Sequence, residues 1–336
     1  SDYGFWIEPT NFSGNTSLFQ AFVNERYRLN RRLKANIGLS VSVFGLNGAS
    51  SLEPRLGLKY KVTNTYELSA GYGLHSMLAP FRIYFEEDID SLNNKSKINQ
   101  DLGFSKSHHF VLAHDFKIGK SSRLKIETYY QHMFDVPVDG DTNLYYSLLN
   151  QGADFGVLFT NNMQNKGTGR NLGVEFTFVR FMNKGLYFLN TVSLYRSLYT
   201  ARDNEEYPTV FDARYAVNVL GGKEFYFKEK TNTKGKTSKS SLTTDVKCVV
   251  NGGQRHTPVN EELSQLENEV RYYRQRTNEL QYRAYARFDV RVAYKVQTKK
   301  MSQEWGIDIQ NITDRDNIFS TQYDPQTQEY RVTNQT

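Results

Sequence analysis

The sequence predicts an all-β fold, a transmembrane antiparallel up-and-down β-barrel, and three observations predict it. Apolar and polar residues alternate along most of the 336 residues, the alternating segments are long, and the connections between them sort by length. Alternation matters because successive side chains of a strand point to opposite faces of a sheet. Strands of this kind give the sheet one apolar face and one polar face, and the apolar face must be kept from water.

Alternating segments recur from end to end, and about twelve of them have the composition of strands. Residues 34–43 are one example, with apolar side chains opposite Lys, Asn, Gly and Ser. Residues 282–296 are another, with apolar side chains opposite a face that carries Arg283, Arg287 and Asp289. In order, the segments lie near 16–30, 34–44, 52–62, 66–76, 107–118, 123–134, 168–182, 185–200, 214–228, 242–251, 282–297 and 302–312.

The length of these segments favours a bilayer over water as the solvent. Residues 282–296 alternate for fifteen residues, whereas strands of soluble proteins usually have about five or six. A tilted strand that crosses a bilayer needs about 9–11 residues. Mean hydropathy is −0.63, and no apolar run is long enough for a membrane helix. A helical membrane protein is therefore excluded, but a barrel is not, because its strands expose apolar residues one at a time.

The connections between the segments sort into two alternating sets. An antiparallel meander places alternate connections at opposite ends, and outer-membrane barrels have short periplasmic turns and long extracellular loops. One set consists of short connections, at 30–33, 62–65, 118–122, 183–185 and 297–301, with the longer 228–241 as its exception. The other set consists of long connections, at 77–106, 135–167, 201–213, 253–281 and 313–336, with the short 45–51 as its exception.

Composition excludes several other classes of protein. A net charge of +6 without a basic helix or an RNA-binding aromatic motif argues against a nucleic-acid partner. A single cysteine, Cys248, excludes an internal disulfide and a paired-cysteine metal site, and no cofactor is expected. No repeat of fixed period and no linker divides the chain, so residues 1–336 are expected to form a single domain. The chain begins without a signal peptide, which is typical of a processed or excised segment.

Several phrases of the sequence, taken together and in this order, resemble the barrel of TonB-dependent outer-membrane receptors of Gram-negative bacteria. The resemblance is to the subgroup with a carboxypeptidase-regulatory-like N-terminal domain. Examples are LEPRLGLKYKV, GYGLHSMLAP, NGGQRHTPVN and RFDVRVAYK. The phrases occupy residues 52–62, 71–80, 123–138, 166–199, 219–225, 251–260, 287–295 and 305–330.

The resemblance implies both an architecture and a function. In that family a barrel of about 22 strands surrounds an N-terminal plug domain, and a TonB-box segment couples transport to the inner membrane. This chain matches the C-terminal part of such a barrel, so we expect the plug and the final strand to lie outside it. The implied function is active uptake of a nutrient through a plugged lumen in the outer membrane. The implied partners are outer-membrane lipid, the plug, TonB and a siderophore, glycan, peptide or cobalamin ligand.

The polar face of the predicted strands supplies the candidate site residues. In the family the plug fills the lumen, so most lumen-facing side chains are expected to contact plug or water, and some near the outer mouth to meet substrate. The lumen-facing candidates are Arg55, Lys59, Arg123, Lys125, Glu127, Gln131, Glu175, Arg283, Arg287, Asp289, Arg291, Asp308 and Gln310. On the apolar face, aromatic residues suit the membrane–water interface, and the candidates are Tyr66, Tyr72, Tyr282, Tyr294 and Trp305.

Three motifs invite other functions, and each has a simpler interpretation. Neighbouring residues on a strand point to opposite faces, so His75–Ser76 is poorly placed as a catalytic pair and His108–His109 as a metal site. GTGRNLG at 167–173 precedes a strand rather than a helix, so a loop that enters a strand is expected there instead of a phosphate loop. No catalytic residues and no metal site are therefore predicted.

Two alternatives of other classes stay open: an outer-membrane hydrolase and a surface β-protein for adhesion or binding. The charged stretch 261–281 has some helical character. It is interpreted as a solvated extracellular excursion or as part of a lid that gathers ligand.

Overall fold

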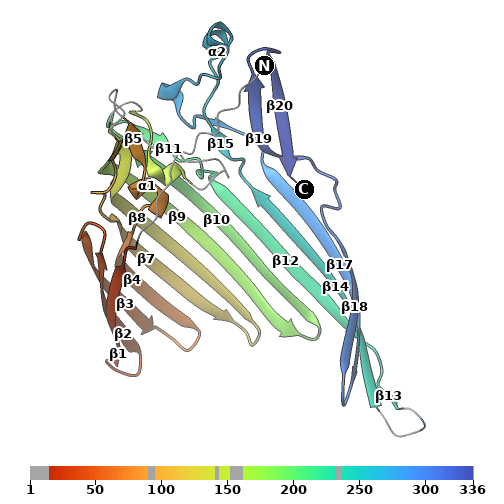
Figure 1. Cartoon of the computed structure of the whole chain (residues 1–336). Coiled ribbons are helices and arrows are strands. Elements are labelled where there is room, and N and C mark those ends of the chain that lie inside the picture. Colours follow the sequence, from red (N-terminus) through yellow and green to blue (C-terminus); the bar gives the residue numbers. More distant parts are fainter. Residues whose placement is uncertain are drawn as a thin grey trace.

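A computed structural model describes residues 15–89, 95–140, 144–151, 162–231, 233 and 237–335. Its main feature is one curved antiparallel sheet, in which every strand of the main path pairs with its neighbours in the sequence (Figure 1). The strands are β1 (Leu18–Arg28), β2 (Leu33–Phe44), β3 (Ser50–Lys61), β4 (Tyr66–Met77), β7 (Ser105–Ile118), β8 (Ser122–Asp139), β9 (Met163–Asn183), β10 (Leu186–Thr200), β12 (Tyr215–Tyr226), β14 (Thr237–Asn251), β17 (Tyr285–Thr298) and β18 (Ser302–Ile309).

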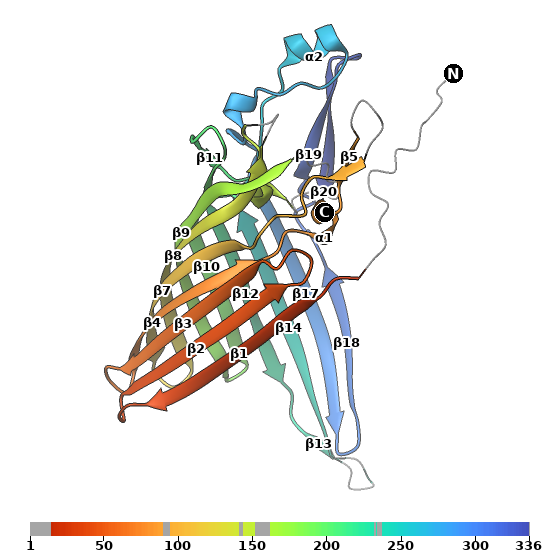
Figure 2. The ribbon, with the colours of Figure 1, turned by 60° about the vertical axis from the view of Figure 1, so that its left-hand side comes forward.

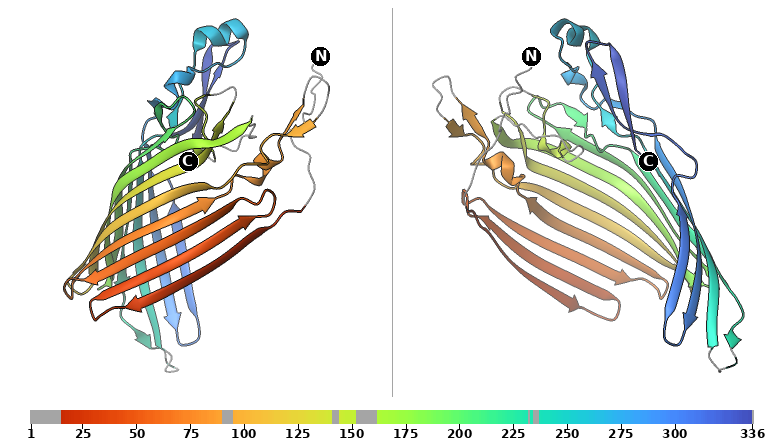
Figure 3. Two further views of the ribbon diagram at one scale, coloured as in Figure 1. Left: turned by 90° about the vertical axis from the view of Figure 1, so that its left-hand side faces the viewer. Right: turned by 45° about the vertical axis from the view of Figure 1, so that its right-hand side comes forward.

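This sheet confirms the predicted meander strand by strand. Two short strands lie off the main path: β11 (Glu206–Pro208) pairs with β10, and β13 (Lys230–Thr231) pairs with β14. The sheet curves as part of a barrel wall but does not close (Figures 2 and 3). Among the described strands, β1 pairs only with β2, and β18 pairs only with β17.

Tight turns connect the strands at one end of the sheet, as the short connections predict. Between β9 and β10, Lys184 has φ 53° and Gly185 has φ 77°. Two positive φ values in a two-residue turn match the right-handed twist of the flanking strands. Between β1 and β2, the side chain of Asn30 accepts hydrogen bonds from the backbone N–H groups of Arg32 (2.8 Å) and Leu33 (2.9 Å). These turns set the register, and hence which side chains share a face.

The long connections lie at the opposite end, where they pack on one another. Helix α1 (Phe81–Tyr84) and strands β5 (Glu87–Ile89) and β6 (Lys95–Lys97) belong to the first long loop. Phe44, Ile83, Tyr84 and Phe104 are buried together in a small apolar cluster between this loop and the sheet. The side-chain amide of Asn47 donates to the carbonyl oxygens of Gln100 (2.8 Å) and Leu102 (2.9 Å). The loop is therefore a packed cap rather than an open excursion.

The last long loops also contain more structure than the sequence predicts. Residues 253–281 include β15 (Arg255–His256), α2 (Glu261–Glu267), η2 (Arg274–Arg276) and β16 (Leu280–Gln281), and η1 (Leu148–Asn150) lies in an earlier loop. Helix α2 is only seven residues long; the side chain of Asn260 caps its start and Asn268 ends it with φ 52°. The helical pattern of 261–281 therefore ends after two turns.

Three sequence predictions are wrong in detail. Residues 313–336 were expected as a connection, but they form the hairpin β19 (Asn317–Asp324) and β20 (Glu329–Gln335), whose two faces are too polar to be recognised by alternation. The loop 228–241 is shorter because β14 begins at Thr237. GTGRNLG lies inside β9, where a Cβ on Gly173 would stand 2.6 Å from the Tyr129 hydroxyl. Its glycines make room for neighbouring side chains.

One face of the sheet is apolar and lacks a covering layer in the described part of the chain. Leu52, Leu56, Leu58, Phe110 and Leu112 are each at least 40% exposed. An apolar face of this extent suits lipid as its solvent. No helix among the described residues is long and apolar enough to cross a membrane.

Candidate functional site

Eleven of the thirteen predicted lumen-facing residues fall on one face of the sheet. Residues paired directly across antiparallel strands project to the same side, and the register links the strands in continuous rows. One row runs through Arg55, Gly73, His109, Gln131 and Asn171. A second row runs through Lys59, Ser69, Ala113, Glu127 and Glu175. The strand patterns thus bring these residues together on the polar face.

Near the tight turns, the polar face of β3, β4, β7 and β8 carries a series of ion pairs. Lys59 Nζ lies 3.1 Å from Glu67 Oε1, and Lys125 Nζ lies 2.6 Å from Glu127 Oε2. Arg123 Nε donates to Asp115 Oδ1 at 2.8 Å, and its second nitrogen also contacts that carboxylate. The charges on this part of the wall therefore largely satisfy one another.

The polar face continues across β14, β17 and β18. Arg287 Nε donates to Asp289 Oδ1 at 2.7 Å, and this carboxylate also accepts from the backbone N–H of Asn311. Arg291 lies 2.7 Å from Glu304 and 3.3 Å from Asp308, both on β18.

Two of the predicted lumen-facing residues lie outside the strands. Arg283 precedes β17 and donates to the carbonyl oxygen of Asp316, and Gln310 follows β18 as an exposed residue. Both belong to the loop end of the sheet rather than to its wall.

Four of the five predicted interface aromatics lie on the sheet. Tyr66 stacks on Phe116 with ring centroids 4.7 Å apart, and Tyr72 packs on Phe110 at 5.1 Å. Tyr294 on β17 pairs directly with Trp305 on β18, with ring centroids 6.5 Å apart.

Tyr282 is the exception among the aromatic candidates. It lies in the loop before β17, stacks on the His256 ring at 4.0 Å, and shares a hydrogen bond with Thr321. Alternation alone had extended the strand to residue 282, but β17 begins three residues later. Tyr282 therefore belongs to the loop end of the sheet rather than to a strand of the wall.

The His75–Ser76 pair does not form a catalytic arrangement. The Ser76 hydroxyl donates to Glu53 Oε1 at 2.5 Å, and no hydrogen bond joins Ser76 to His75 among the described residues. The His75 ring lies 4.5 Å from that of His109 on the adjacent strand. The part of the chain that the structure describes holds no group of three or more His, Cys, Asp or Glu able to bind a metal ion.

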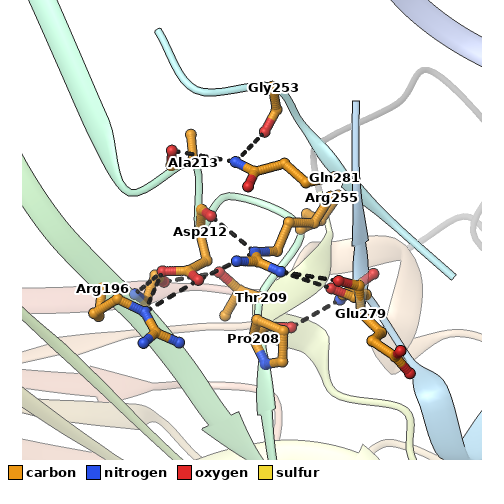
Figure 4. Close-up of polar contacts among 12 residues, drawn as sticks. Arg196, Pro208, Thr209, Asp212, Ala213, Gly253, Arg255, Glu279 and Gln281 are labelled. Carbon is orange, nitrogen blue, oxygen red and sulfur yellow. Dashed lines mark hydrogen bonds and ion pairs between the residues drawn. The ribbon is translucent and has the colours of Figure 1, made fainter. Parts of the chain in front are cut away.

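A buried charge cluster joins the outer loops to β10 (Figure 4). Asp212 is fully buried, and its carboxylate lies 3.1 Å from Arg255 Nε and 3.2 Å from Arg196 Nε. It also accepts a hydrogen bond from the backbone N–H of Ser197 at 2.8 Å. Arg255 donates further to the carbonyl oxygens of Asp212 (2.9 Å) and Glu279 (3.2 Å). Burial lowers the pKa of Arg255, and the charge of Asp212 opposes this shift.

Next to this cluster, a cavity of about 730 Å³ opens among the outer loops. Aromatic rings form much of its lining, from Tyr272, Tyr273, Tyr282 and Tyr330, and Arg276 adds a cation. The Tyr330 hydroxyl donates to Glu261 at 2.8 Å, and burial together with this carboxylate raises the pKa of Tyr330 to about 12. Tyr330 therefore stays neutral, and the four rings offer flat apolar surfaces with polar rims to a ligand.

A second cavity of about 400 Å³ shares Tyr272 with the first and adds Tyr145 and Tyr146. We call the six tyrosines of the two cavities the tyrosine pocket: Tyr145, Tyr146, Tyr272, Tyr273, Tyr282 and Tyr330. Sequence reasoning missed five of them as site residues. The signal was present as two Tyr-Tyr doublets, at 145–146 and 272–273, each inside a predicted long loop.

Comparisons with known proteins agree with this architecture. The ferric-catecholate import receptor Fiu of E. coli has 10% sequence identity and a TM-score of 0.60, and the match covers 95% of this chain and 43% of that chain. The ferric yersiniabactin uptake receptor of Yersinia pestis has 13% identity and a TM-score of 0.59, covering 92% and 42%. A variant of the ferric enterobactin receptor of Pseudomonas aeruginosa has 14% identity and a TM-score of 0.57, covering 90% and 40%. At such identities the likeness establishes the fold.

The chain therefore spans less than half the length of these receptors. A comparison with curated proteins gave no match. The family described as TonB dependent receptor-like, beta-barrel matches residues 1–312. The chain thus belongs to the TonB-dependent receptor β-barrel family of the Gram-negative outer membrane.

Proposed function

We propose that this chain is part of the barrel wall of a receptor that takes up a nutrient across the outer membrane with energy supplied through TonB. The observation that carries the proposal is the tyrosine pocket, which lies among the long loops at the outer end of the wall. A ligand held there would stand at the entrance to the lumen. The named receptors of similar fold, which import ferric siderophores, support this class of function.

The polar face of the sheet has a separate role in this proposal. The eleven predicted residues that lie on its strands face the lumen, and the ion-paired ones contact the plug domain or water rather than substrate. Pairs such as Lys125–Glu127 and Arg287–Asp289 support this role, because side chains that are already paired leave few charges for a ligand. Residues at the loop end, such as Arg283, are the ones placed to meet substrate. Membership of the carboxypeptidase-regulatory-like subgroup remains a prediction.

The ligand that fits the tyrosine pocket is compact, with flat aromatic or sugar-ring surfaces and several hydrogen-bond acceptors. Tyrosine rings supply stacking surfaces, and Arg276 at the rim is paired with Glu279 (2.6 Å), so the rings rather than a free cation carry the recognition. A ferric catecholate combines flat rings with negative charge and is the first probe to use. A glycan offers ring surfaces without charge and is the alternative.

Uptake of radioactive iron tests the proposal directly. The receptor that contains this chain would be produced in a Gram-negative host lacking its own siderophore receptors, and ferric enterobactin supplied. Uptake is expected in cells with TonB and not in cells without it. The double variant Tyr272→Ala, Tyr330→Ala is expected to reduce uptake about tenfold or more. Tyr226→Ala, which removes an exposed tyrosine at the opposite end, serves as the matched control.

Two outcomes would count against the proposal. If the tyrosine substitutions change neither the binding nor the uptake of the ferric enterobactin and glycan probes, the tyrosine pocket has no part in the function. Esterase activity in detergent that disappears in Ser76→Ala would instead support the hydrolase. We propose that this chain has no enzymatic activity, consistent with the hydrogen bond that engages Ser76 with Glu53.

A further inference from the structure

The two ends of the sheet carry opposite charge. The short turns (29–32, 62–65, 119–121, 184–185, 227–236 and 299–301) contain ten Lys or Arg and one Asp or Glu. The loops at the other end (45–49, 78–104, 140–162, 201–214, 252–284 and 310–336) contain twelve Lys or Arg and twenty Asp or Glu. The net charge of the whole chain is only +6, although its basic and acidic residues are concentrated at opposite ends of the sheet. In the outer membrane, the short turns of such a barrel lie on the periplasmic side.

The basic residues of the turns that the structure describes are exposed and lie beside exposed apolar residues. Leu29 (61% exposed) precedes Arg31 and Arg32, and Met182 (50%) precedes Lys184. Ile118 precedes Lys120, Phe227 precedes Lys228, and Met301 follows Lys300, with each of these apolar side chains 47–53% exposed. Cations next to apolar side chains at the end of a lipid-facing wall are typical of the boundary between acyl chains and head groups.

The densest part of this boundary lies on the two C-terminal turns. Lys230 on β13 adjoins Thr231, and their strand pairs with β14 so that Lys230 stands opposite Ser238. Ser238 in turn stands opposite Thr298, which precedes Lys299 and Lys300. The register therefore places Lys228 and Lys230, at β13, on one side of β14, and Lys299 and Lys300, just after β17, on its other side; we call these four the lysine cluster. Strand β13 and the end of the β17–β18 hairpin extend beyond the other turns (Figures 1 and 2).

Aromatic residues border the lysine cluster on the side of the wall. The Phe227 ring lies 6.3 Å from that of Tyr294, and Tyr294 lies 6.5 Å from Trp305. Glu229 is the one acidic residue of these two turns, and it forms an ion pair with Lys239 at 2.6 Å. No ion pair involves the four lysines among the described residues, which leaves their ammonium groups available to an anion from outside the chain.

We propose that the lysine cluster binds the head groups of anionic phospholipids in the periplasmic leaflet. A phospholipid whose phosphate lies at the level of the lysines places its acyl chains against Phe227, Tyr294 and Trp305. One ligand therefore contacts both the lysine cluster and the aromatic rings that border it. A water-soluble acidic protein would satisfy the lysines alone and leave the aromatic rings uncovered. Each lysine near an anionic leaflet adds a favourable electrostatic contribution that salt weakens.

Native mass spectrometry of the full receptor tests this proposal without reference to transport. The receptor would be released from nanodiscs that contain phosphatidylglycerol and phosphatidylcholine in equal amounts and with identical acyl chains. Phosphatidylglycerol is expected to be retained preferentially. The variant K228Q/K230Q/K299Q/K300Q is expected to retain about tenfold less of it. The matched control R82Q/K97Q/R202Q/R274Q changes net charge equally at the other end and is expected to retain it fully.

A charge-conserving variant separates charge from folding. Replacing the same four lysines by arginine is expected to preserve retention, and both variants would first be checked for the heat-dependent gel mobility of a folded barrel. Equal retention of phosphatidylglycerol by wild type and K228Q/K230Q/K299Q/K300Q would overturn the proposal. Equal retention of the two lipids by wild type would do the same. Tighter binding of soluble poly-glutamate than of phosphatidylglycerol would assign the cluster to an acidic protein and also overturn it.

Discussion

At the scale of single residues, the most constrained position is Asp212. It is fully buried, and its side chain and carbonyl together accept from Arg196, Ser197 and Arg255. A buried ion pair adds little net stability, but removing one partner leaves an uncompensated charge away from water. Arg255 is itself 5% exposed and has no other carboxylate partner among the described residues. One carboxylate therefore holds together the segments that contain Arg196, Asp212 and Arg255.

Asp212→Asn is expected to destabilise the outer loops by about 3–5 kcal/mol, because Arg255 keeps its buried charge and loses its counter-charge. Protease cleavage within 253–281 of the folded receptor measures the effect. The matched control is Glu206→Gln, which breaks the half-exposed Arg170–Glu206 pair (2.8 Å). This control is expected to cost about 1 kcal/mol or less. Equal cleavage rates in the two variants would show that Asp212 does not hold the loops.

His256 is expected to make the outer loops less stable in acid. Burial lowers its pKa below the ordinary value of 6.5, and its Nδ1 has no hydrogen-bond partner among the described residues. Between the lowered pKa and 6.5 the unfolded loop binds more protons than the folded one, so stability rises with pH up to about 6.5 and then levels off. Thermal unfolding of wild type and His256→Phe, compared from pH 5 to 7.5, measures this. The variant keeps a ring against Tyr282 and should lose the slope; an unchanged slope would contradict the assignment.

At the scale of elements, the tight turns set the register that brings the polar residues to one face. The β9–β10 turn shows why particular residues are needed. Gly185 has φ 77°, and a Cβ there would stand 2.1 Å from the carbonyl oxygen of Glu224 on β12. Neither the conformation nor the space admits a side chain. A slip of one residue would turn every side chain of β10 to the opposite face.

Gly185→Ala is therefore expected to destabilise the folded receptor by at least about 1–2 kcal/mol, from backbone strain and the close contact. Denaturant unfolding from detergent micelles measures the loss. Gly71→Ala is the control, because the same Cβ at mid-strand on β4 meets no atom within 4 Å and has an ordinary φ. Glycine is unfavourable in a strand, so the control is expected to be neutral or slightly stabilising. Similar losses in both variants would refute the role of the turn.

At the scale of the whole molecule, two faces and two ends define the chain. One face is apolar and exposed, and the other is polar and ion-paired. One end carries tight basic turns, and the other carries packed acidic loops with a tyrosine pocket. Under the proposed function, lipid covers the apolar face, plug and water lie on the polar face, and ligand binds at the loop end.

Substituting an arginine on each face of the sheet tests which face contacts lipid and which contacts water. Leu58→Arg on the apolar face of β3 is expected to destabilise the receptor in lipid by about 2–4 kcal/mol, the cost of a basic residue near the bilayer midplane. Gly71→Arg adds the same group to the polar face, where the Gly71 position is open, and is expected to cost much less. Unfolding in lipid vesicles measures both. A larger loss for Gly71→Arg would reverse the assignment of the faces.

Alternation predicted nearly all the wall, because the period of a strand depends only on local backbone geometry. All twelve wall strands and their order were predicted, and strand ends shifted mainly where polar residues extend pairing, as at the start of β14. The hairpin β19–β20 was missed because neither of its faces is continuously apolar. Tyr282 was misplaced for the converse reason, since its alternation continues beyond the end of pairing.

By itself the sequence determined the strands, their two faces, the sorting of turns and loops, and the family. These depend on neighbours in the chain, and each leaves a local pattern. Which loop residues meet follows only from the tertiary structure: Asp212 meets Arg255, and Asn278 donates to Asn150 across more than a hundred residues. Such contacts depend on how long loops fold over the end of the sheet, and their packing follows no period that a sequence reader could recognise.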